Sequence, residues 1–277
     1  MDIPWNTIYN LSLLTYLIYN YSKYWTIDKI KNLENFLTNN KNNSNLSKSD
    51  IEILNEIKER SKDGEIIKFF TNKADLQCAI TKNSNEKRYT LVFRGTESLW
   101  DWIYNLIVFK KKLRDNIYIH RGFYKQLTYN NTFDNIKNNI KKEIHINPDY
   151  NWYICGHSLG GALASISSYL LSYEFKYIKW TVITLASPRV GNKHFKESFE
   201  SIENLKYYRI CNNRDIVTAI PTFGYSHVGH NLYFDSYKNI WEDFGYFPKV
   251  SYYIYRCWSI KDHKCHTYIN NIKKKLE

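Results

Sequence analysis

The chain has 277 residues, 43% of them hydrophobic, which is long enough for one α/β domain with a full core. Its formal net charge is +12, and Asn, Ile, Lys and Tyr are abundant, as is typical of proteins from an AT-rich genome. The positive charge favours contact with anionic membranes over nucleic-acid binding, because the lysines are scattered along the sequence. The five cysteines are odd in number and lack paired metal-ligand spacing, so they indicate neither a disulfide framework nor a metal centre.

Residues 5–37 are predicted to be helical, because apolar residues recur at spacings of three and four. Within them, Leu11–Ile18 is too short to span a membrane and is expected to pack on a sheet as part of an amphipathic helix. The preceding residues, Met1–Pro4, carry no basic region and no cleavage site. We therefore expect an intracellular, cytoplasmic protein without a transmembrane segment.

The next part of the chain is predicted to contain a loop, a short helix and a hairpin. Residues 38–50 are polar and low in complexity, which predicts a flexible exposed loop, and 51–59 are predicted to form a helix. Two strand-like runs follow at 76–80 and 89–93, joined by turn-forming residues at 83–87. We expect these two runs to pair as an antiparallel hairpin.

Strand-like and helical segments then alternate, which favours a single α/β domain over residues 1–277 with a mostly parallel central sheet flanked by helices. Strands are expected at 150–155, 180–185, 205–211 and 232–235, and helices at 133–144, 163–175 and 270–276. The aromatic stretch Val250–Tyr255 is typical of either a further strand or a buried loop.

Residues 156–161 read Gly-His-Ser-Leu-Gly-Gly, between a strand-like and a helix-like run. In that context a Gly-x-Ser-x-Gly motif is a nucleophile elbow, a sharp turn that exposes a serine hydroxyl in front of a helix N-terminus. A glycine-rich helix start with a serine N-cap is the alternative, whereas a phosphate-binding loop is disfavoured because no Gly-Lys-Ser/Thr follows. We predict that Ser158 is a catalytic nucleophile.

A serine hydroxyl becomes a nucleophile when a base, usually a histidine oriented by a carboxylate, takes its proton. Asp215 follows a strand-like run, where the acid of such a triad lies, although a surface turn also places an aspartate there. Spacing alone does not choose the base among the four histidines that follow, which are His227, His230, His263 and His266.

An ester hydrolase also needs hydrogen-bond donors for the developing oxyanion. Leu159 offers its backbone N–H directly after the serine, and Thr96, after the strand-like run 89–93, is the candidate for the second donor. The bulky apolar segment Leu99–Phe109 is typical of either a mobile lid over an acyl pocket or a buried core segment.

Seven blocks between residues 88 and 269 together resemble the class 3 lipases, the fungal triacylglycerol lipase family. The blocks are LVFRGTESLWDWIYN at 91–105, HRGF at 120–123, GHSLGG at 156–161, ASPRVGN at 186–192, NRDIV at 213–217, GYSHVG at 224–229, and DH with YI at 262–263 and 268–269.

This resemblance implies an α/β-hydrolase fold with an antiparallel hairpin near its N-terminal part and a lid segment over the active site. It implies a serine ester hydrolase of the lipase type, which cleaves fatty acyl esters of glycerides or phospholipids and needs no metal and no cofactor. It selects His263 as the base. The implied roles are a triad of Ser158, Asp215 and His263, oxyanion donors Thr96 and Leu159, and substrate-facing lid residues Leu99, Trp100, Trp102, Ile103 and Leu106.

The expected partner is a lipid or ester substrate, met in transient contact with a membrane or lipid droplet, and no nucleic acid is expected. Unpaired cysteines and the missing leader depart from many family members and favour an intracellular lipid substrate. Four polar residues are expected to hold loops rather than react: His120, Arg189, Asn192 and His227. The alternative function is a catalytically silent lipase-like scaffold that binds lipids or proteins.

Overall fold

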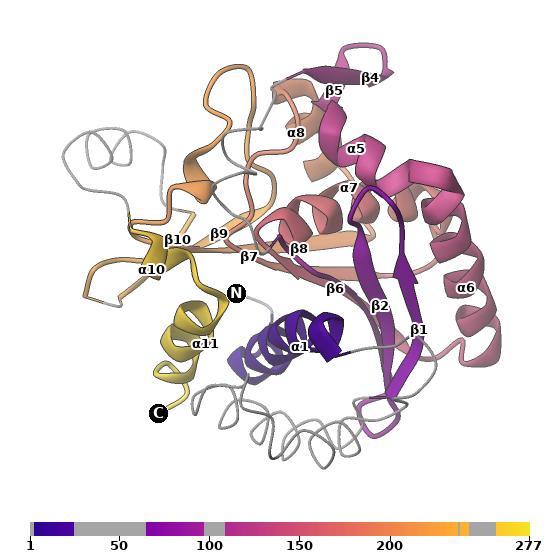
Figure 1. Ribbon diagram of the computed structural model, residues 1–277, viewed down its shortest axis with the longest axis horizontal. Coiled ribbons are helices and arrows are strands. Elements are labelled where there is room, and N and C mark those ends of the chain that lie inside the picture. Colours follow the sequence, from indigo (N-terminus) through magenta and orange to yellow (C-terminus); the bar gives the residue numbers. More distant parts are fainter. Residues whose placement is uncertain (1–2, 25–64, 97–108, 238, 244–258) are drawn as a thin grey trace.

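The computed structural model describes residues 3–24, 65–96, 109–237, 239–243 and 259–277. Within them, the central sheet has eight strands in the order β1-β2-β3-β6-β7-β8-β9-β10 (Figure 1). From β3 to β9 the strands run parallel to their neighbours, and β1, β2 and β10 pair antiparallel. Their bounds are β1 Glu65–Thr71, β2 Gln77–Asn83, β3 Arg88–Phe93, β6 Asn151–His157, β7 Trp180–Leu185, β8 Leu205–Asn212, β9 His230–Phe234 and β10 Ile240–Glu242.

The strand predictions are confirmed in type and order. The predicted hairpin is β2 and β3, whose antiparallel register runs from the pair Cys78–Phe93 to the pair Asn83–Arg88. The four later strands are β6, β7, β8 and β9, in parallel register, so the mostly parallel sheet is confirmed too. The edge strands β1 and β10 were not predicted.

Helices cover both faces of the sheet (Figure 1). One face carries α5 (Arg121–Thr128), α6 (Thr132–Ile146), α7 (Leu159–Glu174) and α8 (Lys193–Glu200), and the other carries α1 (Trp5–Tyr24) and α11 (Cys265–Lys273).

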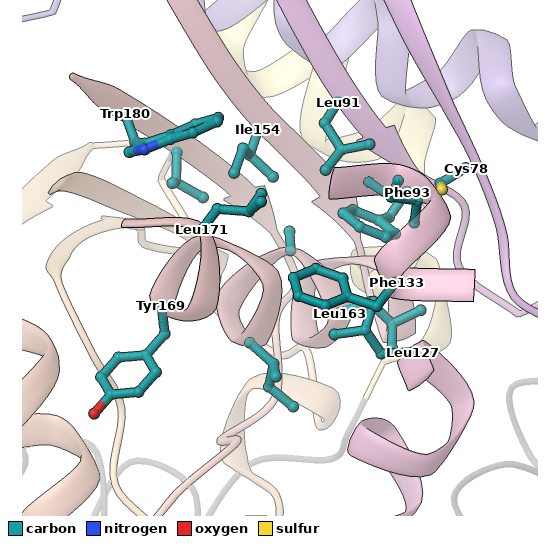
Figure 2. Packing of buried hydrophobic residues seen from close by; sticks show 14 of the residues in the cluster. Cys78, Leu91, Phe93, Leu127, Phe133, Ile154, Leu163, Tyr169, Leu171 and Trp180 are labelled. Carbon is teal, nitrogen blue, oxygen red and sulfur yellow. The ribbon is translucent and has the colours of Figure 1, made fainter. Parts of the chain in front are cut away.

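Successive side chains of the central strands feed the two cores alternately, as a strand's pleat requires. On β7, Val182 packs in the core under α7, and its neighbour Ile183 packs in the core under α1 and α11. Figure 2 shows the first core, which includes Leu163 and Leu171 of α7 and Ile154 of β6. Because both faces are covered, the central strands are apolar almost throughout.

Helix α1 differs from the amphipathic helix that we predicted, because residues 11–18 are buried on every side. Its polar members satisfy themselves within the helix: the hydroxyls of Ser12 and Thr15 donate to the carbonyls of Ile8 and Leu11, at 2.7 and 2.9 Å. A buried hydroxyl with a partner costs little, so these residues do not mark an exposed face. No helix in the described ranges combines the length and apolar character needed to cross a membrane.

The end of the chain also differs from the prediction of a polar loop at 261–267 followed by a helix at 270–276. The structure has a one-turn helix α10 (Ile260–His263), a break at Lys264, and α11 from Cys265. The apolar spacing overlooked there is Cys265, Tyr268, Ile269 and Ile272, all of them buried. These residues pack one face of α11 against the core, and the helix therefore begins five residues before the predicted start at 270.

A second, two-stranded sheet of β4 (Lys110–Arg114) and β5 (Ile117–His120) was not predicted either. The predicted loop 38–50, the predicted helix 51–59 and the aromatic stretch 250–255 lie outside the described residues. A single domain over residues 1–277 therefore stays a prediction.

Candidate active site

The turn between β6 and α7 holds Ser158 in a rarely occupied backbone conformation, with φ +59° and ψ −124°. Its N–H donates to the carbonyl of Leu185 at 2.9 Å, which fixes the turn against β7. A Cβ on Gly156 would collide with the Gly160 carbonyl, and one on Gly160 would collide with the carbonyl of Phe93. Only glycine fits at both places, so the predicted elbow geometry is present and strained at the serine.

The side chains of three distant segments meet at this turn. The Oγ of Ser158 lies 3.0 Å from Nε2 of His263, and Nδ1 of His263 lies 2.9 Å from both carboxyl oxygens of Asp215. A carboxylate accepts hydrogen bonds, so Nδ1 carries the proton and Nε2 accepts from the serine hydroxyl. All three side chains are buried. The structure therefore brings together the serine, the acid and one of the four candidate histidines.

Further donors hold the carboxylate of Asp215. The Val217 N–H donates to Oδ1 at 2.9 Å, and the Tyr268 hydroxyl donates to Oδ2 at 2.7 Å. The Asn212 N–H in turn donates to the Tyr268 oxygen at 2.9 Å. Burial, and then the neighbouring carboxylate, raise the pKa of Tyr268 well above its usual value, so it remains a donor. These bonds fix the plane of the carboxylate that His263 meets.

The residue before the serine, His157, is also tied to the base. One ring nitrogen, Nε2, lies 2.6 Å from the backbone carbonyl of His263, and Nδ1 lies 2.9 Å from the hydroxyl of Tyr19 on α1. A carbonyl only accepts, so Nε2 carries the proton and Nδ1 accepts from the tyrosine. Burial, and then the proximity of His263, lower the pKa of His157 well below its usual value. His157 is thus a neutral link between the elbow, α1 and the backbone of the base.

We expect His157→Gln to weaken the loss of stability on acidification. Above about pH 6.5 the imidazole is neutral in the folded and unfolded chains, while below it only the unfolded chain takes up the proton. As the pH is lowered below that value, proton uptake by this imidazole should lower the free energy of unfolding by at most about 1.4 kcal/mol per pH unit. Glutamine keeps an N–H donor but does not titrate, so it removes this contribution.

Urea unfolding of both proteins between pH 8 and pH 5 measures the difference, with substitution of the exposed His194 on α8 by glutamine as the control. Parallel pH curves for the wild type and His157→Gln would show that His157 takes up its proton equally in both states.

The other three candidate histidines have surroundings of their own. The Nε2 of His227 lies 2.7 Å from the carbonyl of Thr218 and holds a loop. His230 is exposed and lies 3.1 Å from Asp243. His266 is half-buried on α11, beyond the break at Lys264.

The other residues expected to hold loops make such contacts. Arg189 binds backbone carbonyls, Asn192 caps α8, and His120 caps α5. Their partners are the carbonyls of Ala219 and Pro221, the Phe195 N–H and the Phe123 N–H.

Both predicted oxyanion donors lie within the described residues. Leu159 begins α7, and Thr96 follows β3, which is the parallel neighbour of β6. An ideal Cβ on Gly95 would lie 2.6 Å from the carbonyl oxygen of His157, so the segment before Thr96 runs directly against the elbow. The predicted lid residues Leu99, Trp100, Trp102, Ile103 and Leu106 lie outside the described residues.

Three supporting residues had no role in the sequence analysis: Tyr19, Asn212 and His157. His157 stands inside the glycine motif and Asn212 directly before the acid segment, so proximity in sequence was a signal for both. Tyr19 lies 138 residues from its partner, and nothing local indicates that contact.

Comparison with known proteins shows that the chain is similar to lipases and phospholipases. Residues 90–225 match the family model of class 3 lipases. A lipase of Rhizopus niveus is 30% identical over 177 residues, 60% of this chain, and phospholipase A1-IIgamma of Arabidopsis thaliana is 28% identical over 174 residues, 53% of this chain. The chain spans 44% and 42% of the lengths of these two relatives.

Solved structures share the fold over most of the chain. A lipase of Rhizopus microsporus var. chinensis superposes with a TM-score of 0.75 at 22% identity, covering 94% of this chain and 85% of its own. The triacylglyceride lipase of Rhizomucor miehei gives 0.72 at 22% identity, covering 93% and 92%. The predicted α/β-hydrolase fold is confirmed, and the segment of residues 90–225, which spans the elbow and Asp215, belongs to the class 3 lipase family.

Proposed function

We propose that the chain is a serine-dependent carboxylic ester hydrolase of the lipase type. The observation that carries the proposal is the hydrogen-bonded series from Ser158 Oγ through the His263 ring to the Asp215 carboxylate, at 3.0 and 2.9 Å. In this series Nε2 of His263 can accept the proton of Ser158, and Asp215 holds the imidazole in the tautomer with its proton on Nδ1. It supports nucleophilic catalysis over a purely structural role for the elbow.

In the proposed reaction, Ser158 Oγ attacks the ester carbonyl carbon while Nε2 of His263 takes its proton. The tetrahedral intermediate collapses, the ester C–O bond breaks, and the leaving alcohol takes that proton from His263. Water then attacks the acyl-enzyme, gives its proton to His263, and the fatty acid leaves as the proton returns to Ser158. Asp215 stabilises the imidazolium in both halves of the cycle.

The oxyanion is proposed to bind the N–H of Leu159 and the backbone N–H or hydroxyl of Thr96. Leu159 stands at the N-terminus of α7, where the helix dipole favours negative charge. The close approach of Gly95 to the elbow supports a second donor from Thr96.

The proposed substrates are fatty acyl esters of glycerides or phospholipids. The sequence relatives are named as lipases and as phospholipases A1, and both names describe the release of a fatty acid from a lipid ester. Such substrates are met at a lipid surface, so we also propose transient contact with a membrane or lipid droplet.

We propose an intracellular location for the chain. Four cysteines of the described residues are free and buried: Cys78, Cys155, Cys211 and Cys265. Burial raises the pKa of Cys155 to about 12, so its thiol stays protonated and acts as a small apolar residue. Free thiols are typical of a reducing compartment.

A nitrophenyl ester series from acetate to palmitate, together with a fluorophosphonate probe, tests the proposal. We expect hydrolysis with an optimum at one chain length, and one phosphonate adduct on the peptide that contains Ser158, because only that serine has a hydrogen-bonded base in the described site. A folded protein that neither turns over any ester at a supplied lipid interface nor takes the label is a lipase-like scaffold.

A further inference from the structure

The β4–β5 hairpin lies at the periphery of the molecule, next to α5 and α8 (Figure 1). Basic and aromatic side chains gather on it and beside it. Among them are two exposed phenylalanines and three consecutive exposed lysines. We call this set the basic hairpin surface: Phe109, Lys110, Lys111, Lys112 and Phe223.

Contacts join the two segments that form this surface. The Nζ of Lys110 lies 5.1 Å from the ring centre of Tyr225, and an ideal Cβ on Gly224 would lie 2.5 Å from the same Nζ. Lys110 on β4 therefore lies against the loop residues that directly follow Phe223. The Nζ of Lys111 lies 5.9 Å from the ring centre of Tyr124 on α5. Two of the three lysines thus lie over aromatic rings, Lys110 and Lys111, and as successive residues of a strand they point to opposite sides of the hairpin.

The charges of the basic hairpin surface are available to a partner. Among the described residues no carboxylate forms a salt bridge with Lys110, Lys111 or Lys112. An ammonium over an aromatic ring keeps its outer side hydrated and free to meet an anion.

Two large apolar side chains stand in solvent beside these charges. Phe109 is 65% exposed and Phe223 is 91% exposed. Exposed phenylalanine is unfavourable in water but gains free energy by insertion among acyl chains, and lysines beside it gain by approaching anionic headgroups. The combination matches a surface that is apolar within and anionic outside.

The same loop connects the basic hairpin surface to the triad acid. Asp215 follows β8, and its carbonyl accepts from the Thr218 hydroxyl at 2.8 Å. Arg189 then holds the carbonyls of Ala219 and Pro221, just before Phe223. Residues 215–223 thus run under restraint from the carboxylate to the surface, at the carboxyl end of the parallel strands.

We propose that the basic hairpin surface docks the enzyme onto anionic phospholipid surfaces. This proposal rests on the proposed lipase-type function, because it names the surface on which that function operates. Docking brings the loop of Asp215 against the headgroups and raises the local concentration of ester substrate at that end of the molecule.

Vesicle binding of Ser158→Ala, in which the substrate stays intact, tests the proposal. We expect co-sedimentation with phosphatidylcholine vesicles to increase when phosphatidylglycerol is added, and to fall as salt is raised. The further triple substitution Lys110→Gln, Lys111→Gln and Lys112→Gln should lower the partition coefficient onto the anionic vesicles by about tenfold to a hundredfold. It should leave the weak binding to pure phosphatidylcholine unchanged.

A matched triple variant removes the same charge near the opposite ends of the strands. Its substitutions are Lys142→Gln, Lys176→Gln and Lys179→Gln, all at exposed positions. It should bind the anionic vesicles almost as Ser158→Ala alone does. Equal losses in the two triple variants would show that net charge alone recruits the protein, and binding unaffected in both would exclude charge recruitment. Each result overturns the proposal.

Phe223→Ala gives a second, independent measurement. The side chain is 91% exposed, so its removal should change the free energy of unfolding little. We expect weaker binding to both kinds of vesicle, and unchanged binding contradicts the insertion of this side chain. Hydrolysis of soluble nitrophenyl butyrate by the lysine variants with Ser158 intact should stay at the wild-type rate. If the protein binds anionic vesicles but hydrolyses no ester, the docking surface is supported and the proposed hydrolase function is rejected. If it hydrolyses esters but shows no preference for anionic vesicles, the hydrolase function is supported and the docking surface is rejected.

Discussion

Replacement of Ser158 by alanine is expected to lower kcat/KM for nitrophenyl butyrate by about 10⁴-fold or more. The substitution removes the atom that forms the acyl-enzyme and leaves the His263–Asp215 pair at its 2.9 Å spacing. Any rate that remains comes from oxyanion stabilisation and substrate binding, with water in place of the serine. Initial rates at saturating and limiting ester separate kcat from KM, and the loss should lie in kcat.

Ser165→Ala is the matched control for this measurement. Ser165 is buried in α7 and its hydroxyl donates to the carbonyl of Gly161 at 2.7 Å, so its removal tests the cost of losing a buried serine hydroxyl near the site. We expect near-normal kcat/KM with somewhat lower stability. If Ser158→Ala kept a rate within tenfold of that control, another residue would be the nucleophile.

Replacement of Asp215 by asparagine is expected to lower kcat by about 10⁴-fold while the protein stays folded. The amide NH₂ group would face Nδ1 of His263, and the ring would then carry its proton on Nε2. In that tautomer Nε2 cannot accept from the hydroxyl of Ser158. The Val217 N–H can only donate, so it holds the amide oxygen at the Oδ1 position, and the NH₂ group takes the Oδ2 position, beside Nδ1 of His263 and the hydroxyl of Tyr268.

The rate of phosphonate labelling should fall in parallel with kcat, because labelling uses the same activated hydroxyl. Asp262→Asn is the control, since it removes a carboxylate one residue before the base. Within the described part of the chain, Asp262 makes its hydrogen bonds through its backbone, to Ser259 and Asn212. A loss in Asp262→Asn as large as that in Asp215→Asn would point to net charge near the site rather than to the tautomer.

The sequence predicted most of the sheet and the elbow because both follow from local pattern. A buried parallel strand is a short apolar run, and the Gly-x-Ser-x-Gly spacing is forced by the collisions that a Cβ at Gly156 or Gly160 would cause. The β4 strand lacks such a pattern: it reads Lys-Lys-Lys-Leu-Arg and is exposed along most of its length. Its pairing with β5 depends on tertiary position, which no window of sequence contains.

The histidine that acts as the base could not be predicted from sequence spacing either. His263 is 105 residues from Ser158 and 48 from Asp215, and the other three histidines after the acid satisfy the same chain order. Resemblance to a family selected His263, and the structure joins it to both partners. The burial of α1 and the Tyr19–His157 contact depend likewise on which elements meet across the fold.

The packing of α1 against α11 has a consequence for how the chain matures during synthesis. The strands that shape the elbow leave the ribosome well before α10 and α11, which supply His263 and Tyr268. Until α11 docks on α1, Ser158 has no base and the carboxylate lacks one of its donors. A nascent chain is therefore kept from attacking esters around it, and the onset of phosphonate labelling during translation would time the docking of α11.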